Sequence, residues 1–304
     1  MSAGRIRKKL ARWWYGAFVV QRWTIGIASG EDCADGSWIL RGRLLEPLPG
    51  GDFLADPFVV PGTQGRVLLC EWMQVRRGRG VIARVQLDGQ GHIIDIAKLI
   101  DWPPYHLSYP HVFEHDGALY CCPEACYSQT VTLYKLSAGA REVLGSQVSM
   151  PGFQSVDPTM FRHDGRWWLM CTSAREGQSN THLYAFHANS PFGPWHPHAA
   201  NPVVTDISRA RPAGRVFASG GRLYRPAQDC SVRYGGGLRL LEITHLTPQE
   251  YAETPCWTVN PPLGNHGQHG VHTVNADGGT IVYDAYSLRF SPWAWLYRLR
   301  ERFR

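Results

Sequence analysis

Two aspartates occupy equivalent places in the sequence, and each is followed by a proline. Asp56 and Asp157 lie four residues before an apolar residue, Val60 and Phe161 respectively, that opens a hairpin-like pattern. A buried carboxylate is costly unless it is paired, hydrated or used, and two that converge share a site in which one pKa is raised. Paired carboxyl groups break glycosidic bonds, one as acid and the other as base or nucleophile. The alternative is that both aspartates cap turns or hold neighbouring backbone N–H groups.

A second polar group lies in the glycine-rich stretch GNHGQHGVHTV. Its histidines, His266, His269 and His272, follow one another at intervals of three residues. His269 and His272 are candidate ligands for a divalent ion, since imidazole binds many metals. A spacing of three is no zinc signature unless a turn folds the residues together. Hydrogen bonds to substrate or backbone are therefore the favoured role, with metal binding as the alternative.

One pattern recurs five times and must position these residues. It consists of an apolar anchor, a glycine-containing turn and then an aromatic or aliphatic residue. The anchors are Val60, Phe113, Phe161, Phe217 and Val274, spaced 53, 48, 56 and 57 residues apart. Each copy predicts a hairpin, and a third and fourth strand fit in each interval. About four strands per 50 residues is typical of a propeller blade.

The repeats predict an all-β fold: a single five-bladed β-propeller over residues 24–288. A β-sandwich with coincidental turns is the alternative. The first strand of each blade lines the central channel of a propeller, so polar residues at the strand starts converge there. In blade two these are His106, Tyr109 and His111, candidates for contacts with sugar hydroxyls.

Composition and charge limit the class of protein. Hydrophobic residues make up 44% of the 304, which indicates a globular chain rather than a disordered one. The net charge is +6, but residues 1–23 carry six basic and no acidic residues, and residues 289–304 carry five arginines and one glutamate. The body between them is therefore acidic, which argues against nucleic acid as a partner. Eight cysteines without a CxxC pair indicate reduced thiols.

Several long stretches carry a resemblance to a known family. They are FLADPFVV, YHLSYPHVFEHDGALYCCPEA, VDPTMFRHDGRWWLM, GPWHPHAANPV, RPAGRVF and GRLYRPAQDCSVRYGG. Over residues 53–285 the chain resembles the N-terminal domain of plant glucosamine inositolphosphorylceramide transferases and their bacterial relatives. More distantly it is similar to the five-bladed arabinanase, xylosidase and invertase superfamily of glycoside hydrolases. That resemblance implies Asp56 as base or nucleophile, Asp157 as the aspartate that tunes a pKa or stabilises the transition state, and a calcium-centred water cluster near the axis.

The superfamily also implies a general acid from blade four, where this sequence reads SRARPAGRVF and has no carboxylate. Three carboxylates elsewhere end return strands and are predicted to rim the channel. Glu124 and Asp229 are the candidate general acids, and Glu71 is a candidate for substrate binding.

The alternative is that blade four binds a phosphate, because arginine forks fit phosphate oxygens. Arg209, Arg211 and Arg215 open this blade, and Arg225 and Gln228 lie on its return strand. A phosphate leaving group needs little help from a general acid. The competing explanation for these arginines is salt bridging to Asp206 or Asp229.

The two ends share a composition. RIRKKLARWWYGAFVV, within residues 1–23, and SPWAWLYRLRERFR, within residues 289–304, mix basic residues with Trp, Tyr and Leu. Basic amphipathic helices of this kind lie at anionic membrane surfaces. The sequence predicts short helical ends and a cytoplasmic protein attached to the inner face of a membrane. Packing on the propeller rim or a dimer contact is the alternative.

Together these features predict a carbohydrate-active enzyme that transfers a glycosyl unit during assembly of a glycoconjugate or cell-surface polysaccharide. The expected partners are a sugar or sugar-phosphate substrate, a lipid-linked glycan and a partner glycosyltransferase. A hydrolase that transfers to water is the first alternative. A non-catalytic glycan-binding propeller is the second.

Overall fold

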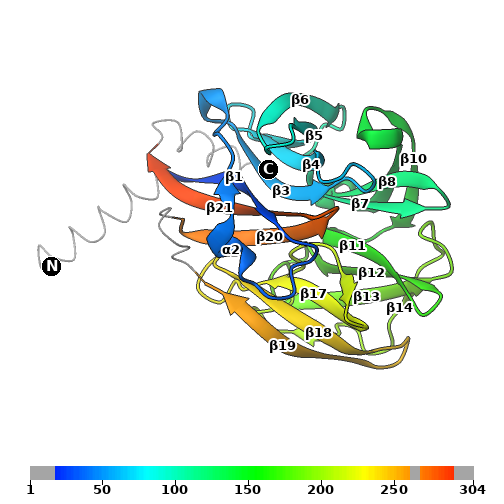
Figure 1. Ribbon diagram of the computed structural model, residues 1–304. Helices are drawn as coiled ribbons and strands as arrows, with labels where there is room; N and C mark the ends of the chain where they lie inside the picture. Colours follow the sequence, from blue (N-terminus) through cyan, green and yellow to red (C-terminus); the bar gives the residue numbers. More distant parts are fainter. Residues whose placement is uncertain (1–17, 261–267, 291–304) are drawn as a thin grey trace, which may run out of the picture.

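The computed structural model describes residues 18–260 and 268–290, and five antiparallel sheets surround a common axis (Figure 1). The predicted five-bladed all-β fold is confirmed. Blade one contains β3 (Phe53–Val59), β4 (Val67–Gln74), β5 (Arg79–Leu87) and β6 (Ile93–Ile100). Blade two contains β7 (Ser108–His115), β8 (Ala118–Glu124), β9 (Thr130–Leu136) and β10 (Val143–Pro151).

The other blades repeat this order. Blade three contains β11 (Ser155–His163), β12 (Arg166–Ser173), β13 (His182–Ala188) and β14 (His196–Pro197), with β15 (Val204–Thr205) also paired to β13. Blade four contains β16 (Phe217–Ser219), β17 (Arg222–Gln228), β18 (Leu238–Leu246) and β19 (Tyr251–Val259). Blade five contains β20 (Gly270–Asp277), β21 (Thr280–Phe290), β1 (Val19–Ser29) and β2 (Arg43–Leu44).

Blade five joins the two ends of the described chain. Strand β1 pairs with β21 along its whole length, from Val19 opposite Phe290 to Ser29 opposite Thr280. Both strands run past the limits of the predicted span 24–288. The predicted helical ends lie mostly in residues 1–17 and 291–304, outside the described part of the chain.

The tight turns explain why the repeat folds as hairpins. Asp116 and Gly117 both have positive φ (48° and 71°), as do Asp164 and Gly165 (47° and 75°). Two successive positive φ values form the turn whose twist matches the flanking strands, and Asp-Gly adopts it readily. In the fifth repeat the two turn residues are Gly278 and Gly279 rather than Asp277 and Gly278.

Little helix interrupts the sheets. The described elements include one four-residue α-helix, α2 (Trp38–Arg41), and three short 3-10 turns, η1 (Pro49–Gly51), η2 (Cys126–Ser128) and η3 (Ala138–Ala140). In residues 18–260 and 268–290, no helix is long and apolar enough to cross a membrane. All eight cysteines are free.

One arginine closes the axis at the end of the inner strands. The side chain of Arg215 donates to the carbonyls of Val59 on β3 (3.1 Å) and Val112 on β7 (3.0 Å) and pairs with Asp277 on β20 (3.1 Å). Its backbone N–H donates to the Asn275 side chain at 2.7 Å. Arg215 therefore joins four blades. Its guanidinium donors have partners within the protein, so they are not free for the phosphate that the alternative prediction placed here.

Candidate active site

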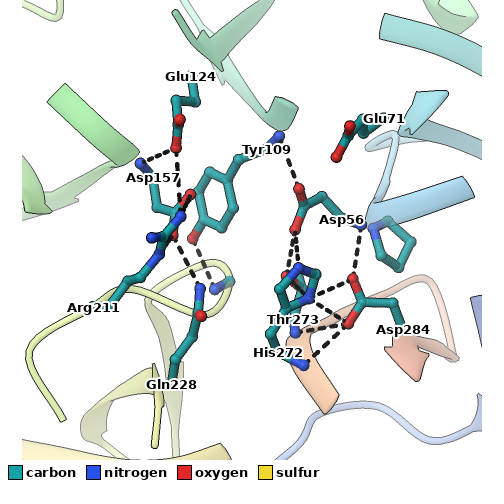
Figure 2. Close-up of polar contacts among 12 residues, drawn as sticks. Asp56, Glu71, Tyr109, Glu124, Asp157, Arg211, Gln228, His272, Thr273 and Asp284 are labelled. Carbon is teal, nitrogen blue, oxygen red and sulfur yellow. Dashed lines mark hydrogen bonds and ion pairs between the residues drawn. The ribbon is translucent and has the colours of Figure 1, made fainter. Parts of the chain in front are cut away.

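The inner strands of three blades share one backbone bend. Asp56, Tyr109 and Asp157 each precede a proline and have φ of 49°, 44° and 50°. At each of them the strand register shifts against its neighbour. Positive φ is uncommon for residues other than glycine and costs on the order of 1–3 kcal/mol, so it persists only where surrounding structure enforces it. The bend brings the two predicted carboxylates and the tyrosine into one buried site (Figure 2).

Asp56 lies in a network of donors. The Thr273 hydroxyl donates to its Oδ1 at 2.7 Å, and the Tyr109 N–H donates to its Oδ2 at 3.2 Å. The Nε2 atom of His272 is 3.7 Å from Oδ1. Asp56 itself donates its backbone N–H to Asp284 Oδ2 at 2.8 Å. The carboxylate is therefore held in one orientation by groups from blades two and five.

Asp284, on β21, anchors this network and is fully buried. Its Oδ1 accepts the backbone N–H groups of His272 (3.1 Å) and Thr273 (3.0 Å), and the His272 Nδ1 donates to the carboxylate at 2.7 Å. Sequence analysis did not select Asp284 or Thr273. A lone acid inside the apolar strand TIVYDAYS was the available signal for Asp284, because such a group is costly to bury without partners.

Asp157 lies in a second group of side chains. Arg211 Nε donates to its Oδ2 at 2.6 Å, and Gln228 Nε2 donates to the same atom at 3.0 Å. The Asp157 N–H donates to Glu124 Oε2 at 3.1 Å, and Arg211 lies 3.8 Å from that Glu124 oxygen. Four residues predicted from the sequence therefore meet here, drawn from blades two, three and four (Figure 2).

The pKa values of Asp56 and Glu124, one carboxyl from each group, are both raised but to different extents. Burial, together with the neighbouring acids Asp284 and Asp157, raises the pKa of Asp56 to about 6, although His272 opposes the shift. Burial and the charge of Asp157 raise the pKa of Glu124 well above its usual range, against Arg211. Burial lowers the pKa of His272, but Asp284 and Asp56 outweigh it and the net shift is upward. Carboxyls with pKa values driven apart can divide base and acid roles.

Glu71 is a further buried acid at this site. Burial and the charge of Asp56 raise its pKa well above the usual range. His106 Nε2 is 3.4 Å from Glu71 Oε1, and His106 Nδ1 accepts the Gly80 N–H at 3.0 Å. A Cβ at position 80 would lie 2.6 Å from Glu71 Oε1 and 2.8 Å from the His106 ring. The pair therefore requires glycine at position 80.

Asp229, the other candidate general acid, has partners of its own. Its Oδ2 accepts from Arg239 at 2.8 and 2.9 Å, and its Oδ1 accepts from Ser231. Burial raises its pKa, but the hydrogen bonds and charge of these partners lower it overall. An ionised carboxylate cannot donate a proton, so the structure favours Glu124 over Asp229 as the acid.

Four further predicted residues have other partners. The guanidinium of Arg225 is buried in a bidentate pair with Glu253 (2.7 and 3.0 Å), and Arg209 pairs with Asp206 at 2.9 Å. His111 Nε2 donates to the Met160 carbonyl at 2.7 Å. His269 is exposed, and its ring stacks on Tyr286 with centroids 6.4 Å apart. His266 lies outside the described residues.

Aromatic side chains flank the histidine and the arginine. Trp23 stacks on the His272 ring at a centroid distance of 3.8 Å. Arg211 lies over the Tyr234 ring at 4.9 Å, and Tyr234 packs edge-on against His272 at 5.4 Å. Tyr234 is 38% exposed, so it offers a ring face at the opening of the site. Sequence analysis missed Trp23 and Tyr234.

Within residues 18–260 and 268–290, one set of residues has ligand atoms close enough to one another for a metal ion. Asp56, His272 and Asp284 place them within 4.8 Å of one another. N–H and O–H donors already occupy these carboxylates: Thr273 and Tyr109 on Asp56, and His272 and Thr273 on Asp284. These donors already use the oxygen lone pairs that a cation would need, so the three residues as arranged do not fit a metal ion.

The fold and the site define a five-bladed β-propeller with acids at its axis. Solved structures with this fold include an exo-β-1,3-galactanase from Clostridium thermocellum, with TM-score 0.54, 13% identity, and coverage of 88% of this chain and 64% of that one. A family 117 glycoside hydrolase from Zobellia galactanivorans has TM-score 0.53, 11% identity, and coverage of 90% and 91%. At these identities the likeness shows the fold alone.

Sequence comparison identifies the particular family. The family model described as Glucosamine inositolphosphorylceramide transferase 1, N-terminal, matches residues 47–276, and the chain belongs to that family. It is 34% identical over 216 residues to Glucosamine inositolphosphorylceramide transferase 1 of Oryza sativa subsp. japonica, covering 69% of this chain and 29% of the rice protein. The Arabidopsis thaliana protein of that name is 30% identical over 211 residues, with coverage of 66% and 27%. The chain thus spans less than a third of these relatives.

Proposed function

We propose that this propeller breaks a glycosidic bond in its central channel and transfers the glycosyl unit to an acceptor hydroxyl. The observation that carries the proposal is a pair of buried carboxyls, Asp56 and Glu124, whose pKa values are raised to different extents. Asp56 is surrounded by donors and a histidine whose pKa is raised, whereas Glu124 lies beside a carboxylate that favours its protonated form. Such a division supplies one base and one acid.

The contacts give each residue a role. Asp56 acts as base towards the acceptor hydroxyl or as nucleophile at the anomeric carbon. Glu124 protonates the leaving oxygen. Asp157, fixed by Arg211 and Gln228, keeps the proton on Glu124 through its charge and stabilises positive charge on the sugar ring in the transition state.

The charge balance favours an alcohol as the leaving group. Arg211 already pairs with Asp157, approaches Glu124 and donates to Asn180 at 3.1 Å. Its charge is thereby matched, and the surrounding acids repel a phosphate. A neutral or amino-bearing saccharide fits this site better than a sugar phosphate, and an alcohol leaving group needs the proton that Glu124 supplies.

The acceptor is the second part of the proposal. The relatives are named as transferases, which supports an acceptor other than water. The matched region is less than a third of these relatives, and a partner glycosyltransferase stays a prediction. Attachment to a membrane through the two basic ends stays a prediction, as does a cytoplasmic location.

The test is a panel of aryl glycosides and neutral oligosaccharides, incubated with the protein and an excess of alcohol or free sugar as acceptor. Mass spectrometry separates released aglycone, hydrolysed sugar and transfer product. Aglycone release that depends on Asp56, together with transfer product, is the expected result. Release with water as the sole acceptor overturns the transfer step. Saturable binding of saccharides without any release overturns the enzyme and supports a binding propeller.

The pH profile of kcat/KM is expected to be bell-shaped. Asp56 acts only when ionised, and its pKa is raised to about 6, so activity rises as the pH increases through about 6. Glu124 acts only when protonated, so activity falls again at higher pH. In Glu124→Gln the alkaline limb should vanish while the acid limb stays. An alkaline limb that survives in this variant would assign it to another group.

The identity of the acid can be tested by leaving-group dependence. Glu124→Gln is expected to lower turnover of alkyl glycosides about 10²-fold, within the range for a lost general acid. Aryl glycosides with acidic leaving groups need no protonation and should be turned over at nearly the wild-type rate. Asp229→Asn, the matched control, should change neither substrate class. Loss of alkyl glycoside turnover in Asp229→Asn with retention in Glu124→Gln would exchange the assignments.

A further inference from the structure

Exposed hydrophobic side chains lie at the end of the propeller where the inner strands begin, which we call the mouth face. Tyr109 and Asp157 of the candidate active site are the second and third residues of their inner strands. Neighbouring strands of a blade are antiparallel, so the loops that follow the second and fourth strands lie at this same end. On these loops and at the end of β21, the exposed large hydrophobic residues are Trp102, Tyr127, Ile207, Val232, Tyr234 and Phe290.

The opposite end of the propeller differs. Its loops follow the first and third strands of each blade, and among the described residues they carry one exposed large hydrophobic residue, Leu40 on α2. The remaining exposed residues of this kind, Ile94, Leu144 and Val148, lie on the outer strands β6 and β10. Single exposed hydrophobic residues are normal on a protein surface, but a group of them at the loops of one end indicates an interaction surface.

Exposed arginines lie among these hydrophobic residues. Arg233 lies between Val232 and Tyr234 in the sequence, and Arg289 precedes Phe290. The exposed charged residues on the described loops and strand ends of the mouth face are Arg76, Arg77, Arg175, Arg233, Arg289, Glu46 and Glu176. The exposed surface of the mouth face is therefore basic, in contrast to the acidic body of the chain.

The described chain also begins and ends at the mouth face. Val19, at the start of β1, is paired with Phe290, at the end of β21. Residues 1–17 contain five basic residues and no acidic residue, and residues 291–304 contain four arginines and one glutamate. Both segments mix these charges with Trp, Tyr and Leu. The composition of the two ends therefore matches that of the loops beside which they join the propeller.

This combination fits the surface of an anionic bilayer. Trp and Tyr rings are favoured at the headgroup level, and basic side chains near the surface are attracted by anionic lipids. A protein interface more often has a continuous core without charges, whereas the hydrophobic residues here lie on separate loops with arginines between them. We propose that the mouth face docks on an anionic lipid bilayer, with Trp102, Tyr127 and Val232 at the headgroup level. This inference does not depend on the proposed enzyme activity, and it extends the predicted attachment by the two ends to a defined face of the propeller.

The test measures sedimentation of the full chain with vesicles of phosphatidylcholine alone and of phosphatidylcholine mixed with phosphatidylserine. Binding to the mixed vesicles, weakened by salt, is the expected result. Val232→Asp should weaken it about 10-fold, because it replaces an apolar contact by repulsion from the lipid charge. Arg77→Ala and Arg175→Ala should each weaken it about fivefold. Ile94→Asp, on the outer strand β6, is the matched control for Val232→Asp and should leave binding unchanged.

Hydrogen exchange in the presence of vesicles separates docking of this face from binding by the two ends alone. Backbone amides of residues 231–234 should gain protection on the mixed vesicles, and those of the turn at residues 164–165, at the opposite end, should not. Vesicle binding that leaves residues 231–234 unprotected and is unchanged in the loop variants would overturn the proposal, because the ends would then bind alone. Absence of binding to the mixed vesicles would also overturn it.

The unfolding midpoint of each variant checks that the protein is folded, which is expected because the replaced side chains are exposed. Asp56→Asn should bind the mixed vesicles as wild type does, because Asp56 is buried in the candidate active site. The lipid-docking face and the proposed enzyme activity can therefore fail independently. Equal weakening of binding in Val232→Asp and Ile94→Asp would overturn the location of the docking face.

Discussion

Replacing Asp56 by asparagine is expected to lower turnover by about 10³- to 10⁴-fold while the protein stays folded. The loss is at the upper end for a general base, because the change removes the charge as well as the proton acceptor. Asparagine keeps the shape and tolerates the positive φ of 49° at this position. Its oxygen can accept the Tyr109 N–H and its amide can donate to Thr273, since a hydroxyl also accepts.

The measurement compares kcat/KM and the unfolding midpoint of Asp56→Asn with those of wild type. Asp164→Asn is the matched control, because it has the same chemistry at an exposed turn with an equivalent positive φ of 47°. It should leave both quantities unchanged. If Asp56→Asn kept a tenth or more of the wild-type turnover, Asp56 would not be the base. If it lost its fold, Asp56→Glu would provide the comparison, with turnover reduced but its dependence on pH retained.

Most of the fold could be predicted because its signals are local. An Asp-Gly or Gly-Gly pair sets its own backbone conformation, and the anchors before each pair repeat at nearly constant intervals. The closure of blade five could not be predicted in this way. It depends on β1 pairing with β21 across more than 250 residues, and neither strand contains a turn motif that points to the other.

The residues of the site that could be predicted are those at the start of an inner strand. Asp56 and Asp157 occupy such starts and converge as expected. Asp284 was not selected because it lies on the second strand of its blade, and its contacts with Asp56 and His272 arise only when the blades come together. The sequence also placed Asp229 and Arg225 near the axis. In the structure each forms an ion pair, Asp229 with Arg239 and Arg225 with Glu253. Which charge pairs with which is decided by side-chain packing between neighbouring strands, and sequence spacing does not contain that information.

Replacing Arg215 by methionine is expected to lower the free energy of unfolding by about 2 kcal/mol, because it removes a partly buried ion pair and the donor to two carbonyls. Methionine keeps much of the apolar stem but has no donor. The carbonyls of Val59 and Val112 and the carboxylate of Asp277 would each lose a partner in the middle of the propeller. Asp277 is partly exposed, and water can compensate part of its loss, so the two carbonyls carry much of the effect.

Arg222→Met is the control, because Arg222 pairs with Glu242 at 3.3 Å but is 64% exposed. Exposed pairs contribute about 0–1 kcal/mol, so this change should be small. Chemical denaturation followed by two probes measures both variants and checks that each unfolds in one transition. Equal, small losses of unfolding free energy in the two variants would mean that water or neighbouring groups donate to the Val59 and Val112 carbonyls when Arg215 is absent. A large loss confined to Arg215→Met would identify this guanidinium as the group that joins blades one, two, four and five.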